Sequence, residues 1–323
     1  MAGITDHAFR VICHRFGAAF SFTEMISAKA IHYGDRKTAS LAVIGGEGGV
    51  GIQIFGSDAE IMAEAAARLS SGNYAGAESQ PKGLPDMIDI NMGCPVKKIV
   101  GGGDGSALMK NPDGIYEIVS AVKKSCPLPV SVKMRTGWDG GHINALECAA
   151  AAAEGGASVI TVHGRTREQF YSPPIDYETV AAVKKAVEKI RKEIFVIGNG
   201  GICDLESAKK MIDTGVDGLM IGQGAMGRPW IFDELSASLA GERYTPPDVG
   251  ERIGIAAEHI RLLAAEKGEY TAVHEGRKHL MWYVKGMRGA AEFRDRVCRI
   301  ESLSALEEEL SALGEANRGV ILN

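Results

Sequence analysis

The chain has 323 residues, of which 45% are hydrophobic, so it can bury a large core. Its formal net charge of −5 excludes a globally basic nucleic-acid-binding protein. No apolar run reaches the roughly 18 residues of a membrane span, and no signal peptide is recognisable. The six cysteines form no C-x-x-C pair, which argues against a zinc site or a disulfide framework. We therefore expect a cytoplasmic protein with no membrane association and no metal.

Short apolar segments rich in β-branched residues alternate with amphipathic, alanine-rich stretches through the first 240 residues. Continuous apolar runs of this kind are typical of strands buried on both faces of a parallel sheet. Their alternation with helical stretches predicts repeated βαβ units. The seven predicted strands are residues 18–25, 50–56, 87–93, 129–137, 158–166, 194–202 and 217–224.

Polar side chains end nearly every predicted strand. An open doubly wound sheet concentrates its site at one switch point, whereas a barrel gathers all strand ends around one mouth. We therefore predict an α/β fold of the TIM (β/α)₈ barrel type. The eighth strand would precede Met1, so we expect a first strand that is truncated or a start assigned too late. The polar residues are Glu24, Gln53, Asn91, Lys133, Arg135, His163, Arg165 and Asn199.

The pattern changes beyond residue 240, where only helical sequence follows. We predict a catalytic barrel domain over residues 1–240 and a helical domain over residues 241–323. Residues 72–86 are polar and rich in glycine and proline, which predicts a solvent-exposed loop.

Cys94 follows the third predicted strand, in a loop framed by glycine and proline and beside Lys97 and Lys98. A lone cysteine is most often a buried apolar thiol. Nearby cations would instead favour the thiolate. A thiolate suits a nucleophile and a neutral thiol suits a proton donor, and the residues alone leave both roles open.

Several strand-end residues together predict a cofactor site. Lys133 lies within an apolar strand, where a charge is costly without a partner. It either extends to the barrel rim or stabilises negative charge on an electron-rich ring such as a reduced flavin. Gln53 can both donate and accept, which suits a pyrimidine-like edge. His163 and Asn199 would complete the polar ring.

A G-x-G-x-x-G pattern occurs at Gly222, Gly224 and Gly227, after the last predicted strand. A dinucleotide-binding motif belongs in the first βα turn of its domain, so the position argues against that interpretation. Together with Gly200 and Gly201 after the preceding strand, the pattern favours a phosphate site at the barrel mouth. Simple turn glycines are the alternative.

The segment 277–299 has seven cations against two acids, with Trp282, Tyr283 and Phe293 interleaved. It is either a solvated helix face or a surface that binds a polyanion, in which the aromatic rings stack on bases or simply pack. The cations are Arg277, Lys278, Lys285, Arg288, Arg294, Arg296 and Arg299.

Blocks along nearly the whole chain resemble the tRNA-dihydrouridine synthase family, most closely its bacterial B-type branch. They include "MAGITDHAFR", "DINMGCPVKKIVGGGDGSALMKNP", "VSVKMRTGW", "ITVHGRTREQFY", "VIGNGGI", "GQGAMGRPWIF" and "RKHLMWYVKGM". The resemblance implies an FMN-dependent barrel with a helical tRNA-binding domain. It also implies reduction of the C5–C6 double bond of uridine in tRNA with NADPH, without an obligate protein partner.

The same resemblance implies roles for individual residues. Cys94 would protonate C5 after hydride from the flavin reaches C6, and Asn91 would hold the base. Gln223 stands where an arginine is common, which would weaken one phosphate contact. The implied cofactor set is Met1, Ala2, Gln53, Lys133, His163, Asn199, Gly200, Gly201, Gly222 and Gln223. The residues expected to bind the RNA substrate are Asn91, Arg135, Arg165, Arg277, Lys278, Lys285 and Arg288.

Two other functions remain open. One is a flavin-dependent barrel that acts on a free small molecule, as dihydroorotate dehydrogenase-like enzymes do; the basic segment 277–299 counts against it. The other is a catalytically inactive RNA-binding relative, against which the presence of Cys94, Lys133 and His163 counts.

Overall fold

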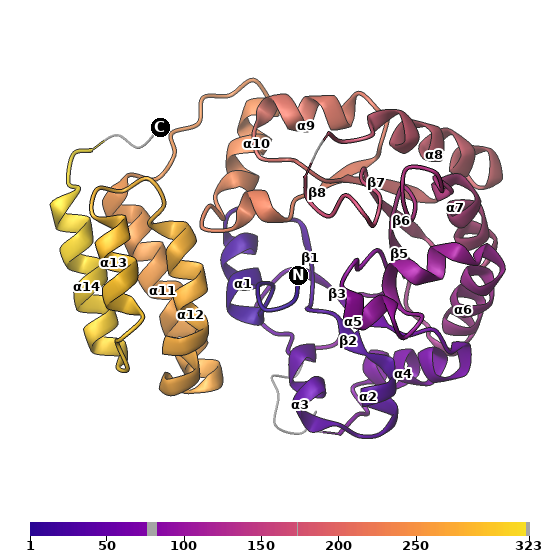
Figure 1. Cartoon of the computed structure of the whole chain (residues 1–323), viewed down its shortest axis with the longest axis horizontal. Coiled ribbons are helices and arrows are strands. Elements are labelled where there is room, and N and C mark those ends of the chain that lie inside the picture. Colours follow the sequence, from indigo (N-terminus) through magenta and orange to yellow (C-terminus); the bar gives the residue numbers. More distant parts are fainter. Residues whose placement is uncertain (76–82, 173, 321–323) are drawn as a thin grey trace. The chain divides into compact units, whose positions relative to one another are not determined.

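The computed structural model describes residues 1–75, 83–172 and 174–320 (Figure 1). These residues form two compact units. The barrel unit consists of residues 1–2 and 19–223, and the helical unit of residues 3–18 and 224 onward. The helical unit thus includes residues 3–18 and 224–240, which the sequence pattern places with the barrel. The division of catalysis and tRNA binding between two domains stays a prediction.

The barrel unit is built on a parallel sheet with the order β1-β3-β4-β5-β6-β7-β8, and the short β2 also pairs with β3. Every predicted strand segment overlaps an observed strand, which confirms the barrel-type α/β fold. In the described part of the chain, β1 and β8 are the two edges of the sheet. The strands are β1 (Phe20–Phe22), β2 (Ile26–Ser27), β3 (Gly49–Phe55), β4 (Met87–Met92), β5 (Val130–Arg135), β6 (Val159–His163), β7 (Phe195–Asn199) and β8 (Gly218–Met220).

Helices follow the strands and lie along the outer side of the curved sheet (Figure 1). Most of the longer ones begin at an aspartate or asparagine whose side chain accepts a backbone N–H of the first turn. Residues 76–82 of the predicted loop lie outside the described residues. The helices are α2 (Ala28–His32), α3 (Arg36–Ala39), α4 (Ala59–Ser71), α5 (Lys97–Val100), α6 (Pro112–Ser125), α7 (Ala145–Glu154), α8 (Tyr177–Ile190) and α9 (Leu205–Ile212).

The two faces of the sheet differ in chemistry because successive strand residues point to opposite sides. A Cβ on Gly198 would lie 2.5 Å from Met211 of α9, so the face of Gly198 carries the helices. Val162 pairs with Gly198 and shares that face. Polar residues occupy the other face, where Gln53 pairs with Asp89 and Asn91 with Lys133. The register therefore gathers the polar side chains inside the barrel.

The helical unit has its own apolar core, in which Trp230, Tyr283 and Phe293 are the largest fully buried side chains. Gly227 has φ +67°, and a Cβ there would lie 2.3 Å from the backbone of Trp282, so this glycine permits close packing. Within the described residues, no helix is both long and apolar enough to cross a membrane. The helices are α1 (His7–Arg15), α10 (Ile231–Leu239), α11 (Val249–Lys267), α12 (Glu269–Tyr283), α13 (Ala290–Val297) and α14 (Leu303–Ala316).

Candidate active site

A network of buried side chains joins the strands β3, β4 and β5. Asp89 accepts hydrogen bonds from Gln53 Nε2 at 2.7 Å and from Ser131 Oγ at 2.5 Å. Asn91 Nδ2 donates to Gln53 Oε1 at 2.8 Å. Burial raises the pKa of Asp89, and the hydrogen bonds from Ser131 and Gln53 partly offset this. The network fixes the orientation of both amide side chains.

Asn91 also holds the loop that carries Cys94. Its Oδ1 accepts the backbone N–H groups of Gly93 at 3.2 Å and Cys94 at 2.9 Å. From the other side, the carbonyl oxygen of Cys94 accepts both the backbone N–H of Ser106, at 3.1 Å, and its hydroxyl, at 2.9 Å. The Cys94 side chain remains partly exposed. The thiol is thus presented on a loop that is anchored at two points.

Lys133 provides a positive charge beside Cys94. Burial and then the charge of Arg135 lower the pKa of Lys133 to about 8, whereas Asp89 and Cys94 act to raise it. Its ammonium makes no hydrogen bond to the described residues. Lys133 is therefore a desolvated cation with free donors inside the barrel, where a bound group can accept from it.

Arg135 ties the Cys94 loop to the loop after β6. Its Nε donates to the carbonyl oxygen of Gly93 at 2.7 Å, and its Nη1 donates to those of Thr166 at 2.9 Å and Phe170 at 3.0 Å. Phe170 has φ +51°, a left-handed conformation that is unfavourable for a bulky residue. Burial lowers the pKa of Arg135 to about 10. Two nitrogens of the Arg135 guanidinium therefore hold loop backbone in place. Its Nη2 remains for the predicted contact with RNA.

His163 ends β6 and is only 6% exposed. Burial, reinforced by the charges of Lys133, Arg135 and Arg165, lowers its pKa to about 2, so the ring is neutral near pH 7. Its Nδ1 is buried and has no hydrogen-bond partner in the described part of the chain, and the same holds for Thr161 Oγ1. Buried polar atoms without partners indicate a place where a ligand or water binds.

The glycine pair after β7 has a backbone that other residues rarely adopt. Gly200 has φ +112° and Gly201 has φ +68°. A Cβ on Gly200 would lie 3.1 Å from Ile175 Cδ1 and 3.2 Å from His163 Nε2. Arg165 lies nearby, since a Cβ on Gly201 would be 3.9 Å from its Nη2. The backbone of this turn, which no side chain covers, therefore lies next to His163 and the cation of Arg165. Exposed backbone N–H groups beside a cation are typical of an anion site.

The remaining predicted cofactor residues gather at the end of β8. A Cβ on Gly222 would lie 3.5 Å from Met1 Sδ, so these two residues are neighbours. Asn199 Nδ2 donates to the Met220 carbonyl oxygen at 2.7 Å and thereby ties β7 to β8. Ala2 and Gln223 are exposed. Asn199 therefore has a structural bond in addition to its predicted cofactor role.

The predicted basic surface belongs to the helical unit. Arg277 is partly buried and its Nη2 donates to the Ile300 carbonyl oxygen at 2.6 Å. Lys278 is also partly buried, whereas Lys285 and Arg288 are exposed. Of the three interleaved aromatic residues, Tyr283 and Phe293 are packed in the core, and Trp282 is 40% exposed. Trp282 is thus the aromatic residue of this segment that can stack on a base.

Three residues of the site were not predicted from the sequence: Asp89, Ser131 and Trp138. Asp89 and Ser131 anchor the network, and the alternation of polar and apolar residues in β4 and β5 would have indicated both of them. Trp138 has the cation of Lys110 3.5 Å and that of Arg167 4.5 Å from its ring centre. These contacts come from separate loops, which no local sequence pattern brings together.

The fold and the site define a class of protein: an α/β-barrel enzyme with a cysteine and a desolvated lysine at the carboxyl ends of its strands. Residues 1–317 match the family model described as Dihydrouridine synthase (Dus), and the chain belongs to this family.

Two relatives share the family over most of their length. The tRNA-dihydrouridine synthase B of Pseudomonas putida is 39% identical over 308 residues, which cover 94% of this chain and 87% of the relative. The protein of the same name from Shewanella oneidensis is 40% identical over 288 residues, which cover 88% and 84% of the two chains. Among solved structures, the Eimeria tenella DHODH in complex with ferulenol covers 60% of this chain and 59% of its own, with 15% identity and a TM-score of 0.41. A similarity at that level supports no conclusion about function.

Proposed function

We propose that this chain is a tRNA-dihydrouridine synthase. It reduces the C5–C6 double bond of uridines in tRNA, with FMN as cofactor and NADPH as reductant, in the cytoplasm and without an obligate protein partner. The observation that carries the proposal is the Cys94 loop, anchored by Asn91 and Ser106 beside the cation of Lys133. Membership of the dihydrouridine synthase family supports it.

The barrel interior fits FMN by the chemistry of its unpartnered groups. His163 Nδ1 is buried without a hydrogen bond to the described residues, and Lys133 is a desolvated cation. They would hold the ring system, with Gln53 at its edge. The backbone of Gly200 and Gly201 would hold the phosphate. When bound, FMN supplies the hydride that C6 of uracil receives, and NADPH is the source of its electrons.

Cys94 supplies the proton that completes the reduction. The C5–C6 double bond of uracil is conjugated with the C4 carbonyl, so hydride at C6 leaves negative charge on C5 and O4. A thiol proton delivered to C5 removes this charge and forms the second C–H bond. The sulfur becomes a thiolate, which the neighbouring positive charges of Lys133 and Arg135 stabilise.

The tRNA must deliver an unstacked base to this pocket. The exposed cations Lys285 and Arg288 of the helical unit contact phosphates, and Trp282 offers a ring for stacking. Such contacts position the RNA and make its binding dependent on salt.

The test is nucleoside mass analysis of unmodified tRNA incubated with the chain, FMN and NADPH. Dihydrouridine should form only when the protein is present. Cys94→Ala should retain flavin and NADPH oxidation and lose dihydrouridine formation. Wild-type rates of tRNA modification by Cys94→Ala would refute the proton-donor role.

A second arm separates tRNA from a free pyrimidine as the substrate. The double variant Lys285→Glu, Arg288→Glu should weaken modification of tRNA, and free uridine should be a poor substrate for both proteins. Efficient reduction of free uridine by both would favour the small-molecule enzyme instead. Charge reversal is preferable to deleting residues 241–323, because Ala8 and Trp230 share a core with that region.

A further inference from the structure

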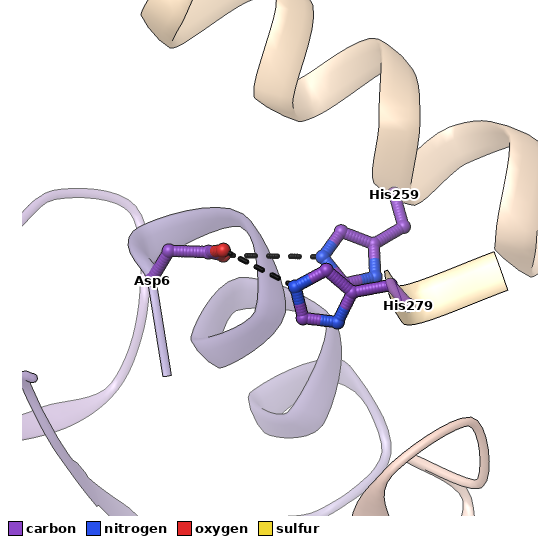
Figure 2. A group of neighbouring side chains, drawn as sticks. All are labelled: Asp6, His259 and His279. Carbon is purple, nitrogen blue, oxygen red and sulfur yellow. Dashed lines mark ion pairs between the residues drawn. The ribbon is translucent and has the colours of Figure 1, made fainter. Parts of the chain in front are cut away.

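We propose that Asp6, His259 and His279 in the helical unit bind a divalent transition-metal ion, with Zn²⁺ as the best fit. Each residue offers one ligand atom, and these atoms lie within 4.8 Å of one another. Figure 2 shows the carboxylate at the start of α1 facing the two imidazole rings of α11 and α12. Two imidazole nitrogens and one carboxylate form a donor set typical of zinc and related metals.

The distances suit ligands that share an ion better than direct hydrogen bonds. His279 Nε2 lies 3.4 Å from Asp6 Oδ2, and His259 Nε2 lies 3.9 Å from Asp6 Oδ1. Direct N–H···O bonds in proteins span about 2.7–3.2 Å. Zinc bonds of about 2.0–2.2 Å in a tetrahedral arrangement place ligand atoms roughly 3.3–3.6 Å apart. The His279–Asp6 distance lies in this range, and the His259–Asp6 distance is slightly longer.

Burial makes the unpartnered atoms significant. Asp6 is 5% exposed, His259 0% and His279 2%. Asp6 Oδ2 and the Nε2 atoms of both histidines are buried without a hydrogen bond to the described residues. Three such atoms that converge on one point need a common partner, and a cation satisfies all of them at once.

The surroundings orient the three ligands. The Nδ1 atom of His259 lies 3.3 Å from Tyr283 Oη, a contact at the other ring nitrogen that orients the ring. Asp6 Oδ1 accepts the backbone N–H of Phe9 at 3.0 Å. The Phe9 ring lies 5.7 Å from each histidine ring, centre to centre. Both rings and the carboxylate are therefore held before any ion arrives.

Electrostatics show that the three groups interact closely. Burial alone would raise the pKa of Asp6, but His259 and His279 together bring it well below its ordinary value. The carboxylate therefore interacts with both rings, as the ligands of one ion must.

A fourth ligand completes a structural zinc site. Cys13 of α1 is buried, but its sulfur is not among the ligand atoms that lie within 4.8 Å of one another. We therefore expect a water molecule as the fourth ligand.

Because the site is closed to solvent, its ion would stabilise the unit rather than catalyse a reaction. It would fasten the segment at residue 6 to α11 and α12. That segment begins four residues after Ala2, the last residue of the barrel unit at this end of the chain. The expectation of no metal from the sequence considered cysteine spacing, whereas these ligands come from distant parts of the chain.

The experiment uses the full chain, purified without a metal-affinity tag. Elemental analysis should find about one equivalent of zinc per chain. After treatment with a chelator, Co²⁺ should restore stoichiometric binding with visible absorption bands. The spectrum should lack a thiolate-to-cobalt band in the near ultraviolet, because the three protein ligands are two imidazoles and a carboxylate. Metal should also raise the thermal unfolding temperature of the chelated protein.

Matched variants test the assignment. Asp6→Asn and His279→Gln should lose the bound metal, and His274→Gln, which removes an exposed histidine of the same helix, should keep it. Wild-type protein that contains no stoichiometric metal and gives no cobalt spectrum would overturn the proposal, and would leave a direct Asp–His–His network. Retention of the metal by Asp6→Asn and His279→Gln would also overturn it. The wild-type titration decides the question even if a variant does not fold.

Discussion

The carboxamide of Asn91 bridges two parts of the candidate active site: its oxygen accepts the backbone N–H of Cys94 at 2.9 Å, and its nitrogen donates to Gln53 Oε1 at 2.8 Å. Gln53 is in turn fixed by Asp89, which is fully buried. The position of the thiol loop thus depends on a chain of hydrogen bonds that begins in the barrel core. Asn91 is therefore a positioning residue for Cys94, in addition to its predicted contact with the base.

Replacing Asn91 tests this link. Asn91→Ala removes the acceptor for the N–H groups of Gly93 and Cys94, so the loop is no longer held in its position. Because a small displacement of a catalytic group is costly, we expect dihydrouridine formation to fall by about 10²-fold with FMN still bound. Asn91→Asp keeps the acceptor and should lose less. Single-turnover rates measure both variants, and an unchanged rate in Asn91→Ala would refute the positioning role.

The buried charge of Lys133 should lower the free energy of unfolding. Its folded-state pKa of about 8 lies below the ordinary 10.5, so at pH 7 the buried charge costs on the order of 3 kcal/mol. This cost disappears as the pH rises from 8 through 10.5. Lys133→Met should therefore raise the free energy of unfolding at pH 7, with a gain that shrinks toward pH 10.5, and should abolish activity. Urea denaturation at several pH values measures the gain.

Lys184→Met is the matched control for this lysine. Burial would lower the pKa of Lys184, but hydrogen bonds to Asp217 and Glu188 raise it. Lys184 Nζ lies 2.7 Å from both carboxylate oxygens of Asp217. Its removal should lower the free energy of unfolding. Equal signs for Lys133→Met and Lys184→Met would contradict our account of Lys133.

His163 should make the chain sensitive to acid. Its pKa is about 2 when folded and 6.5 ordinarily, so below pH 6.5 only the unfolded chain takes up this proton. The folded state then loses about 1.4 kcal/mol for each pH unit. His163→Gln should remove this loss, so its stability should fall less steeply between pH 6.5 and 4.5. The exposed His274→Gln variant, whose ring contacts the Tyr270 carbonyl oxygen, should follow the wild type. Parallel curves for all three proteins would count against the buried neutral ring.

Gly200→Ala tests the proposed phosphate site. The backbone at φ +112° is strained for alanine, and the new Cβ would press on Ile175 and His163. We expect a loss of about 1–3 kcal/mol in stability and weaker FMN binding, measured by thermal unfolding and by flavin fluorescence. Gly140→Ala is the control, because a Cβ at that position would meet no atom within 4 Å. FMN affinity that is equal in both variants would exclude this turn from the cofactor site.

The sequence predicts the barrel strands well because each is a short apolar run that ends in a polar residue. It also places Cys94 and Lys133 at strand ends, where the structure has them. The boundary of the helical unit is not predicted, because residues 3–18 join it through contacts with helices near the other end of the chain. Periodicity describes local structure and carries no information about such partners.

The roles of individual side chains are harder to predict than their positions. Arg135 and Asn91 have the polar groups expected of substrate-binding residues, but both also make bonds to loop backbone. The cations next to Cys94 in the chain, Lys97 and Lys98, are exposed, whereas Lys133 interacts with it from another strand. Neighbours in space therefore define the chemistry of this thiol.

The helical unit draws on both ends of the chain, and this determines the order in which the protein can fold. Its ion pair between His7 and Glu266 joins residues 259 positions apart. α1 is translated long before α11, on which it packs, and its buried residue Phe9 stacks on His259 of α11. Contacts of such separation form late because a long loop must close. Although α1 is translated well before its partner α11, it is therefore among the last helices to reach its native position.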